Sequence, residues 1–281
     1  MKRVLSVQDI TCVGKCSLTV ALPIISAMGV ETAVIPTALL SCHTAFPDFT
    51  FCDLSDHIPS ITAMLKAQNM DFDAIYTGYL GSAEQIRLVE KIFDDFTTDH
   101  NFIVVDPAMA DFGKLYKGFN PSFAECMAKL CTKADIILPN ITEACYLLGI
   151  PYIGEHYTKS DIQDILIQLS QQGCPYCVLT GVSFDSDTLG VIAYDRMNDC
   201  FFEYYSEKLP EHFHGTGDVF ASAFTGALTL NNDREMALQI AVDFTLDCIK
   251  ATKNNLYARW YGVDFESALP NLIRRINLSS F

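Results

Sequence analysis

Short apolar segments alternate with longer amphipathic segments along most of this chain, and this alternation restricts its fold more than any other feature. The short segments are rich in β-branched residues and mostly end at glycine, proline or a polar residue, which is typical of buried strands. Strands are predicted at Val4–Val7, Thr32–Ile35, Ala74–Thr77, Phe102–Asp106, Ile136–Leu138 and Tyr176–Thr180. Helices are predicted between them at Ser17–Ala27, Ile58–Gln68, Ser82–Phe96, Pro121–Cys131, Thr142–Leu148 and Lys159–Gln172. We therefore expect an α/β fold with a central, mostly parallel sheet and helices on both faces.

The pattern changes in the last third of the chain. Leu189–Tyr194 and Cys200–Tyr205 flank the polar segment Asp195–Asp199 and are predicted to form a β-hairpin. Closing helices are predicted at Asp218–Leu230, Arg234–Ala251 and Phe265–Ile276. Because no linker, repeat or low-complexity tract interrupts the sequence, we predict a single domain over residues 1–281.

Charge and composition exclude several classes of protein. A net charge of −15 argues against a nucleic-acid or anionic-membrane partner, and an anionic ligand would need backbone dipoles and a divalent metal ion to offset it. No apolar run reaches the roughly 18 residues of a membrane span, and the apolar start of the chain ends at Gln8, too early for a signal peptide. The 11 cysteines show no pairing pattern, so reduced thiols in a cytoplasmic protein are expected.

A glycine-rich turn precedes the first closing helix, at His214-Gly215-Thr216-Gly217-Asp218. Glycines let several backbone N–H groups point into one concavity, and the following helix adds the positive end of its dipole. Such a turn can bind a phosphoryl group, and a carboxylate at its rim can take a proton from an attacking hydroxyl group. The alternative is an ordinary loop in which Asp218 only complements the helix dipole.

Polar residues gather where the predicted parallel strands end. Ligands of such sheets bind outside the carboxyl ends of the strands, so these residues are the candidates for a site. They are Gln8-Asp9, Ser41-Cys42-His43-Thr44, Thr77-Gly78-Tyr79, Asp106-Pro107, Pro139-Asn140 and Thr180-Gly181.

Together these segments resemble the pyridoxal kinases of the ribokinase-like superfamily over nearly the whole chain. The segment Gly78-Tyr79-Leu80-Gly81-Ser82 is typical of the vitamin B6 branch, whereas Gly215-Thr216-Gly217-Asp218 marks the superfamily as a whole. The other matching segments are Val7-Gln8-Asp9, Val13-Gly14, Ser41–Thr44, Val105–Asp111, Leu138–Glu143 and Leu179–Gly181.

The resemblance implies that the γ-phosphoryl group of ATP is transferred to the 5′-hydroxymethyl group of pyridoxal, pyridoxamine or pyridoxine. It implies Asp218 as the general base and Gly215, Thr216 and Gly217 as the anion hole. The pyridine ring would lie beside Asp9, His43, Thr44, Tyr79 and Asp218. The nucleotide would lie near Asp106, Asn140, Glu143, Thr180 and Gly181, and Mg²⁺ would be organised by Asp106, Asp111 and Glu143. A monovalent cation and a homodimer are further properties of the family.

Several alternatives stay open from the sequence. Glu143 could simply close a capping box with Asn140, and His43 could be a packed, hydrogen-bonded histidine. Asp9 stands where many relatives carry serine or threonine, which puts ring specificity in question and leaves hydroxymethylpyrimidine as an alternative substrate. A non-catalytic vitamin B6-binding protein on the same fold is the alternative from a different class.

Overall fold

The structure of the chain, a computed structural model, describes residues 1–211, 213–230 and 233–278. It divides into two compact units. The first unit comprises Met1–Tyr76 and Leu209–Phe281, and the second comprises Thr77–Lys208. The single domain predicted over residues 1–281 stays a prediction.

The strands of the first unit follow the order β4-β1-β2-β3. Their bounds are β1 Arg3–Thr11, β2 Glu31–Leu40, β3 Phe51–Asp53 and β4 Ala74–Thr77. β1 and β2 pair in parallel, whereas β3 pairs antiparallel to β2. β1 is buried over nearly its full length, as expected for a parallel strand inside a sheet that is covered on both faces.

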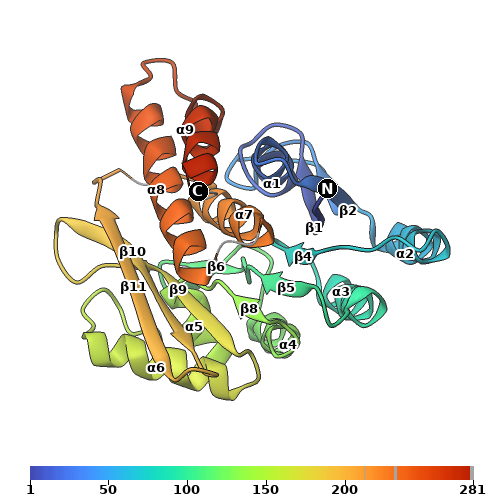
Figure 1. The fold of residues 1–281 in the computed structure, drawn as a ribbon, viewed down its shortest axis with the longest axis horizontal. Helices are drawn as coiled ribbons and strands as arrows, with labels where there is room; N and C mark the ends of the chain where they lie inside the picture. Colours follow the sequence, from blue (N-terminus) through green and yellow to red (C-terminus); the bar gives the residue numbers. More distant parts are fainter. Residues whose placement is uncertain (212, 231–232, 279–281) are drawn as a thin grey trace. The chain divides into compact units, whose positions relative to one another are not determined.

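The helices of the first unit are α1 Leu18–Ala27, α2 Ile58–Ala67, α7 Thr216–Thr229, α8 Arg234–Asn254 and α9 Phe265–Leu278, with a 3₁₀ turn at Ser55–His57. α7 packs against α1 and α8, and α8 lies beside α9 (Figure 1). Gly226 allows the close contact between α7 and the end of α1, because a Cβ atom there would lie 2.5 Å from Sδ of Met28. α7 is therefore buried along most of its length from Val219 onward, whereas its first turn is partly exposed.

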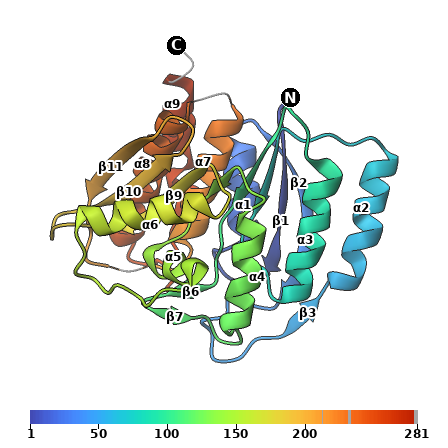
Figure 2. The ribbon, with the colours of Figure 1, turned by 90° about the horizontal axis from the view of Figure 1, so that it is seen from below.

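The strands of the second unit follow the order β5-β8-β9-β10-β11. Their bounds are β5 Phe102–Val105, β8 Ile136–Ile137, β9 Tyr176–Val182, β10 Thr188–Asp195 and β11 Cys200–Glu207, with a separate hairpin of β6 Ala110–Asp111 and β7 Lys114–Leu115. β5, β8 and β9 are parallel, and β10 and β11 continue the sheet in antiparallel pairing. The helices are α3 Ala83–Phe96, α4 Pro121–Cys131, α5 Ile141–Leu148 and α6 Lys159–Gln171. α6 lies against β9 and β10 (Figure 2).

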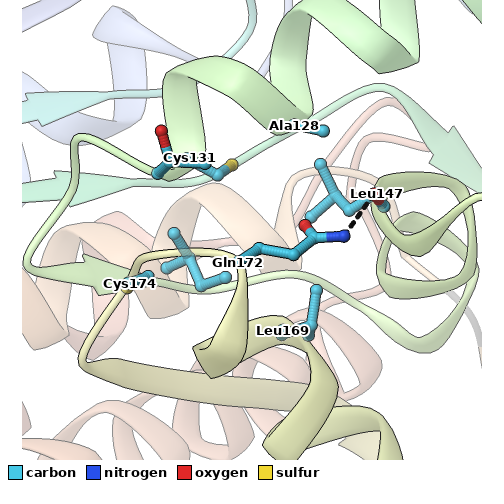
Figure 3. Close-up of a pocket in the computed structure, with 8 residues that line it drawn as sticks. Ala128, Cys131, Leu147, Leu169, Gln172 and Cys174 are labelled. Atoms are coloured by element: carbon cyan, nitrogen blue, oxygen red, sulfur yellow. Dashed lines mark hydrogen bonds between the residues drawn. The ribbon is translucent and has the colours of Figure 1, made fainter.

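A small hollow in the second unit is lined by residues of α4, α5 and α6 and by the segment that leads into β9 (Figure 3). The side chain of Gln172 crosses it, and its amide donates a hydrogen bond to the carbonyl oxygen of Leu147 at 3.4 Å. Cys131 and Cys174, which also line it, are buried thiols. The hollow holds none of the residues that the sequence singled out, so we regard it as a packing feature.

The predicted α/β class is confirmed, and the predicted helices and strands are found with bounds shifted by a few residues. β3, β6 and β7 were not predicted, because two or three residues carry no periodic pattern. One expectation was wrong in a way that bears on the site. β1 runs on to Thr11, so Asp9 lies within the strand instead of beyond its end. None of the helices over the described ranges combines the length and apolarity that crossing a bilayer requires.

Candidate active site

Asp218 lies in the first turn of α7, whose N-cap is Gly215. Gly215 has a φ of 78°, in the left-handed region that glycine adopts without strain. The N-cap of α1 is Ser17, and its backbone N–H donates a hydrogen bond to the carboxylate of Asp218. The N-terminal ends of two helices thus meet at one acidic side chain. Because helix N-termini carry partial positive charge, this is a favourable place for anions.

A close backbone contact holds these two helix ends together. A Cβ atom at Gly215 would lie 2.0 Å from the carbonyl oxygen of Lys15, so the space admits only glycine. The ammonium of Lys15 in turn donates hydrogen bonds to Asp264 at 2.7 Å and to Glu266 at 2.8 Å. Lys15 therefore ties the segment before α1 to the N-terminal turn of α7 and to the start of α9. The role of Lys15 was not predicted from the sequence, because no local pattern marks a carbonyl oxygen that lies against a distant glycine.

The environment of Asp218 changes its acidity. Burial raises the pKa of Asp218 from its ordinary value of 3.8 to about 7, the Ser17 N–H lowers it, and the negative charge of Asp9 raises it. Near neutral pH this carboxyl is therefore present in both its protonated and its ionised form. A general base works best when its pKa lies close to the working pH, and Asp218 meets that requirement.

Asp9 lies at an irregularity in the pairing of β1 with β2. The register shifts between Gln8 and Ile10, and Gln8 pairs with Pro36. The extra residue lies on β2, where Thr37 and Ala38 stand opposite Asp9, next to a proline that has no N–H to donate to the ladder. The Asp9 side chain is buried, and the hydroxyl of Thr11 donates a hydrogen bond to its Oδ2 at 2.9 Å.

His43 and Thr44 lie in the loop that follows β2. Nδ1 of His43 accepts a hydrogen bond from the N–H of Ala45 at 3.0 Å. Burial and, to a lesser extent, His214, whose ring centroid lies 5.0 Å away, together lower the pKa of His43 to about 4. His43 is therefore a neutral, hydrogen-bonded histidine, as the packed alternative would have it, and its contact with a substrate stays a prediction, as does that of Thr44.

An aromatic cluster that the sequence analysis missed anchors this loop. The ring of Phe46 is tilted against that of Trp260, with centroids 4.5 Å apart, and its centroid lies 5.7 Å from that of Tyr261. His214 meets Trp260 edge to face at 6.4 Å. Contacts between aromatic rings thus connect the loop after β2 with the residue before Gly215 and with the segment before α9. Trp260 is the only tryptophan of the chain and was the one signal in the sequence that could have pointed here.

In the second unit, Glu143 is buried at the start of α5 and accepts three backbone hydrogen bonds. Its Oε2 accepts from the N–H of Asn140 at 2.9 Å, and its Oε1 accepts from Met109 at 3.0 Å and from Ala110 at 3.4 Å. Oδ1 of Asn140 accepts from the N–H of Glu143, which completes a capping box. Both oxygens of Glu143 are therefore engaged, and the capping alternative describes what the side chain does. Burial raises the pKa of Glu143 to about 8, against the three N–H donors, which lower it.

Asp106 and Asp111 flank the segment that Glu143 holds. Asp106 is largely buried directly after β5, and its N–H donates to the carbonyl oxygen of Thr77 at 2.9 Å. Asp111 is exposed at the β6–β7 turn, where its Oδ1 accepts from the N–H of Phe112. Over the described part of the chain, no three histidine, cysteine or acidic side chains are grouped as metal ligands. The assignment of Mg²⁺ to Asp106, Asp111 and Glu143 stays a prediction.

Each of the remaining predicted residues of the second unit has its own set of neighbours. The ring of Tyr79 lies 5.5 Å from that of Phe119. The N–H of Thr180 donates to Pro139 at 2.9 Å, and Gly181 has a φ of 71° with open space on its Cβ side. These contacts neither involve nor exclude a ligand, so the roles of Tyr79, Asn140, Thr180 and Gly181 stay predictions.

Comparison with known proteins identifies the family. The sequence profile of the Phosphomethylpyrimidine kinase family matches residues 23–260. The chain belongs to this family. A crystal structure of a Bacteroides thetaiotaomicron protein, provisionally named phosphomethylpyrimidine kinase and crystallised with pyridoxal, is 40% identical, with a TM-score of 0.91 over 96% of this chain and 95% of that one.

Two further relatives carry names from vitamin B6 metabolism. The crystal structure of pyridoxal kinase from Lactobacillus plantarum is 31% identical, with a TM-score of 0.89 over 98% of this chain and 97% of that one. A protein of Staphylococcus epidermidis provisionally named pyridoxine kinase is 29% identical over 181 residues, which is 63% of this chain and 63% of that protein. The match thus spans less than two thirds of that curated relative. The predicted resemblance to the ribokinase-like vitamin B6 kinases is confirmed.

For this family member, we expect Gly215→Ala to be strongly destabilising, because the new methyl group would clash with the Lys15 carbonyl oxygen at a positive φ. The loss should be about 2–5 kcal/mol in the free energy of unfolding. Gly217→Ala is the matched control, since a Cβ atom there meets nothing within 4 Å. It should change the free energy of unfolding by about 1 kcal/mol or less. Urea unfolding of both variants measures the difference, and equal stabilities would contradict the contact.

We expect Glu143→Gln to lower the free energy of unfolding by about 1–3 kcal/mol, because the glutamine amide leaves at least one buried backbone N–H without an acceptor. Asp111→Asn, at an exposed carboxylate, should change it by less than about 0.5 kcal/mol. A Glu143→Gln variant as stable as the parent chain would show that the three hydrogen bonds do not hold this segment.

Proposed function

We propose that this protein transfers the γ-phosphoryl group of ATP to the 5′-hydroxymethyl group of pyridoxal, pyridoxamine or pyridoxine. The observation that carries the proposal is the carboxyl of Asp218, which has a pKa near 7 and lies where the N-termini of α1 and α7 meet. The names of the relatives support a kinase, and the pyridoxal bound by the Bacteroides protein supports the vitamin B6 substrate.

The residues of the first unit would act on the acceptor alcohol. In its ionised form Asp218 takes the proton of the 5′-hydroxyl group as the oxygen attacks the phosphoryl group. The backbone N–H groups of Gly215–Gly217, at the positive end of α7, stabilise the negative charge that develops on the phosphoryl oxygens. His43, Thr44 and Asp9 are proposed to line the ring of the substrate.

The residues of the second unit are proposed to serve the nucleotide. Mg²⁺, when bound with ATP, would offset the charge of the phosphates. Because both oxygens of Glu143 are engaged by backbone N–H groups, it is poorly suited to ligate the ion directly. Asp106 and Asp111 suit a Mg²⁺ that keeps most of its waters, with Glu143 shaping the segment between them. Asn140, Thr180 and Gly181 are proposed to line the nucleotide, and Tyr79 the pyridine ring.

Three further properties belong to the same proposal. The 11 cysteines of the chain are free, which supports the reducing cytoplasm as its location. A homodimer and a dependence on a monovalent cation are proposed from the family resemblance alone.

Hydroxymethylpyrimidine is the second candidate substrate, because the matching family takes its name from phosphomethylpyrimidine. The test is a panel of pyridoxal, pyridoxamine, pyridoxine, hydroxymethylpyrimidine and ribose with Mg·ATP. ATP consumption that depends on a vitamin B6 compound supports the proposal, and turnover of the pyrimidine alone supports the second candidate. Tight binding of pyridoxal without turnover would instead indicate a non-catalytic binding protein.

We expect Asp218→Asn to lower kcat by about 10²–10⁴-fold, because the amide cannot accept the proton of the alcohol. Substrate affinity should change little, since the two side chains have the same shape. Steady-state kinetics with pyridoxine at saturating ATP measures both constants. A variant that keeps more than about a third of the parental kcat would remove Asp218 from the mechanism.

The raised pKa of Asp218 also predicts how stability depends on pH. The folded chain binds a proton at Asp218 up to about pH 7, whereas the unfolded chain releases it near 3.8, so this carboxyl lowers stability as pH rises through that interval. Asp218→Asn should therefore gain stability relative to the parent chain between pH 5 and pH 7 and level off above about pH 7. The matched control is Asp264→Asn, because the pKa of Asp264 is lowered by its contacts with Lys15 and Asn255. Its effect should be flat over the same interval, and a flat profile for both variants would contradict the raised pKa of Asp218.

A further inference from the structure

The loop between β2 and β3 carries two of the residues proposed to line the substrate, His43 and Thr44, and it contributes little to the core. None of residues 41–50 is buried. The N–H of His43 donates a hydrogen bond to the carbonyl oxygen of Val13 at 2.9 Å, and the N–H of Phe46 donates to the carbonyl oxygen of His43 at 2.9 Å. These hydrogen bonds fix the shape of the turn, but they give the loop no apolar anchor.

The side chain of Phe46 supplies that anchor. Its ring centroid lies 4.5 Å from that of Trp260 and 5.7 Å from that of Tyr261, within the range in which aromatic pairs attract. The rings of Trp260 and Tyr261 meet edge to face at 5.9 Å, so each supports the other. Trp260 and Tyr261 thus form a ring platform against which Phe46 packs.

The segment that carries the ring platform is held by contacts of its own. A Cβ atom at Gly262, the next residue, would lie 2.4 Å from Cβ of Lys15. Asp264 accepts a hydrogen bond from the ammonium of Lys15 at 2.7 Å and from the side-chain amide of Asn255 at 2.6 Å. Its N–H donates to the hydroxyl of Thr252 at 2.7 Å. None of these contacts involves the loop after β2, so the ring platform is fixed independently of the loop that packs on it.

The ring platform also reaches the residue before the glycine turn. Trp260 meets His214 edge to face at 6.4 Å, and the ring of His214 lies 5.0 Å from that of His43. Gly215, however, is held against the carbonyl oxygen of Lys15 without any contribution from the rings. Loss of the ring platform should therefore loosen the loop and leave the turn at Gly215 in place.

We propose that Trp260 is a positioning residue for the phosphoryl acceptor, because it holds the loop of His43 and Thr44, through Phe46, in the conformation that binds the acceptor ring. The inference rests on the proposed function, in which this loop lines the pyridine ring. A loop that adopts its binding conformation for only a fraction of the time raises the apparent dissociation constant by the inverse of that fraction. Turnover of the bound substrate stays the same, so the contact acts on KM and not on kcat.

The test measures kcat, the KM for pyridoxine and the KM for ATP. Trp260→Leu should raise the KM for pyridoxine about three- to tenfold, the loss expected for one aromatic pair, and should change the other two constants less than about twofold. Trp260→Phe, which keeps a ring against Phe46, should stay within about twofold of the parent chain in all three constants. Phe46→Leu should act like Trp260→Leu, and the double variant should be no worse than either, because both changes remove the same contact.

The matched control is Tyr257→Leu, which removes a ring that is 86% exposed in the same segment. It should leave all three constants unchanged, and thermal unfolding verifies that each variant folds. Because Trp260 is the only tryptophan of the chain, its fluorescence also tests the contact without any substrate. Phe46→Leu should shift its emission to longer wavelength and increase its quenching by acrylamide, since the indole gains contact with water. Tyr257→Leu should do neither.

An equal rise in the KM for pyridoxine and for ATP would overturn the role of Trp260, and so would a loss confined to kcat. Either result would leave the proposed kinase function standing. Unchanged fluorescence of Phe46→Leu would overturn the contact itself. No turnover of pyridoxine by the parent chain would remove the proposed function and, with it, the role of Trp260. Should Trp260→Leu fail to fold, Phe46→Leu, a smaller change on the loop side of the contact, decides.

Discussion

The contact between Gly215 and the carbonyl oxygen of Lys15 is the constraint on which the active-site geometry of the first unit depends. It brings the N-terminal turn of α7 against the segment before α1, at a distance that admits no side chain. The same approach allows the N–H of Ser17 to reach Asp218. Burial and the nearby charge of Asp9 then raise the pKa of Asp218 to about 7. A packing constraint thereby contributes to an acid–base property, because removing water from a carboxyl group favours its neutral form.

In the second unit, the buried carboxyl of Glu143 has a structural role. Glu143 gathers the N–H groups of Met109, Ala110 and Asn140, and so it joins the loop after β5 to the start of α5. Two acidic side chains of similar burial thus have opposite surroundings. Glu143 accepts backbone N–H groups from two segments, whereas Asp9 accepts side-chain hydroxyl groups from Thr11 and Ser17. The contrast lies in the donors, which are backbone N–H groups for Glu143 and side-chain hydroxyl groups for Asp9.

The secondary structure was predicted well from the sequence, because the patterns that indicate helices and strands are local. Apolar runs and helical periodicity depend on residues a few positions apart, and the predicted α4 and β4 agree with the structure residue for residue. The turn at Gly215 could also be predicted from the sequence, since glycine and a following acidic residue mark the start of a helix that can bind an anion. The sequence did not predict the contacts of Lys15 or the aromatic cluster of Phe46, Trp260 and Tyr261. The residues that make these contacts lie far apart in the sequence.

The sequence by itself therefore determined the α/β class, the order of the elements, the family and the acidic residue that follows the glycine turn. Only the tertiary structure decided which groups surround each acidic side chain. From its local sequence, Glu143 had a capping box with Asn140 as one alternative, whereas the sequence left the partners of Asp9 open. Both side chains are buried to a similar extent, and they differ in the donors that the folded chain brings to each carboxyl. Glu143 accepts from Met109 and Ala110, which lie in a distant segment, and no local pattern of residues encodes that contact.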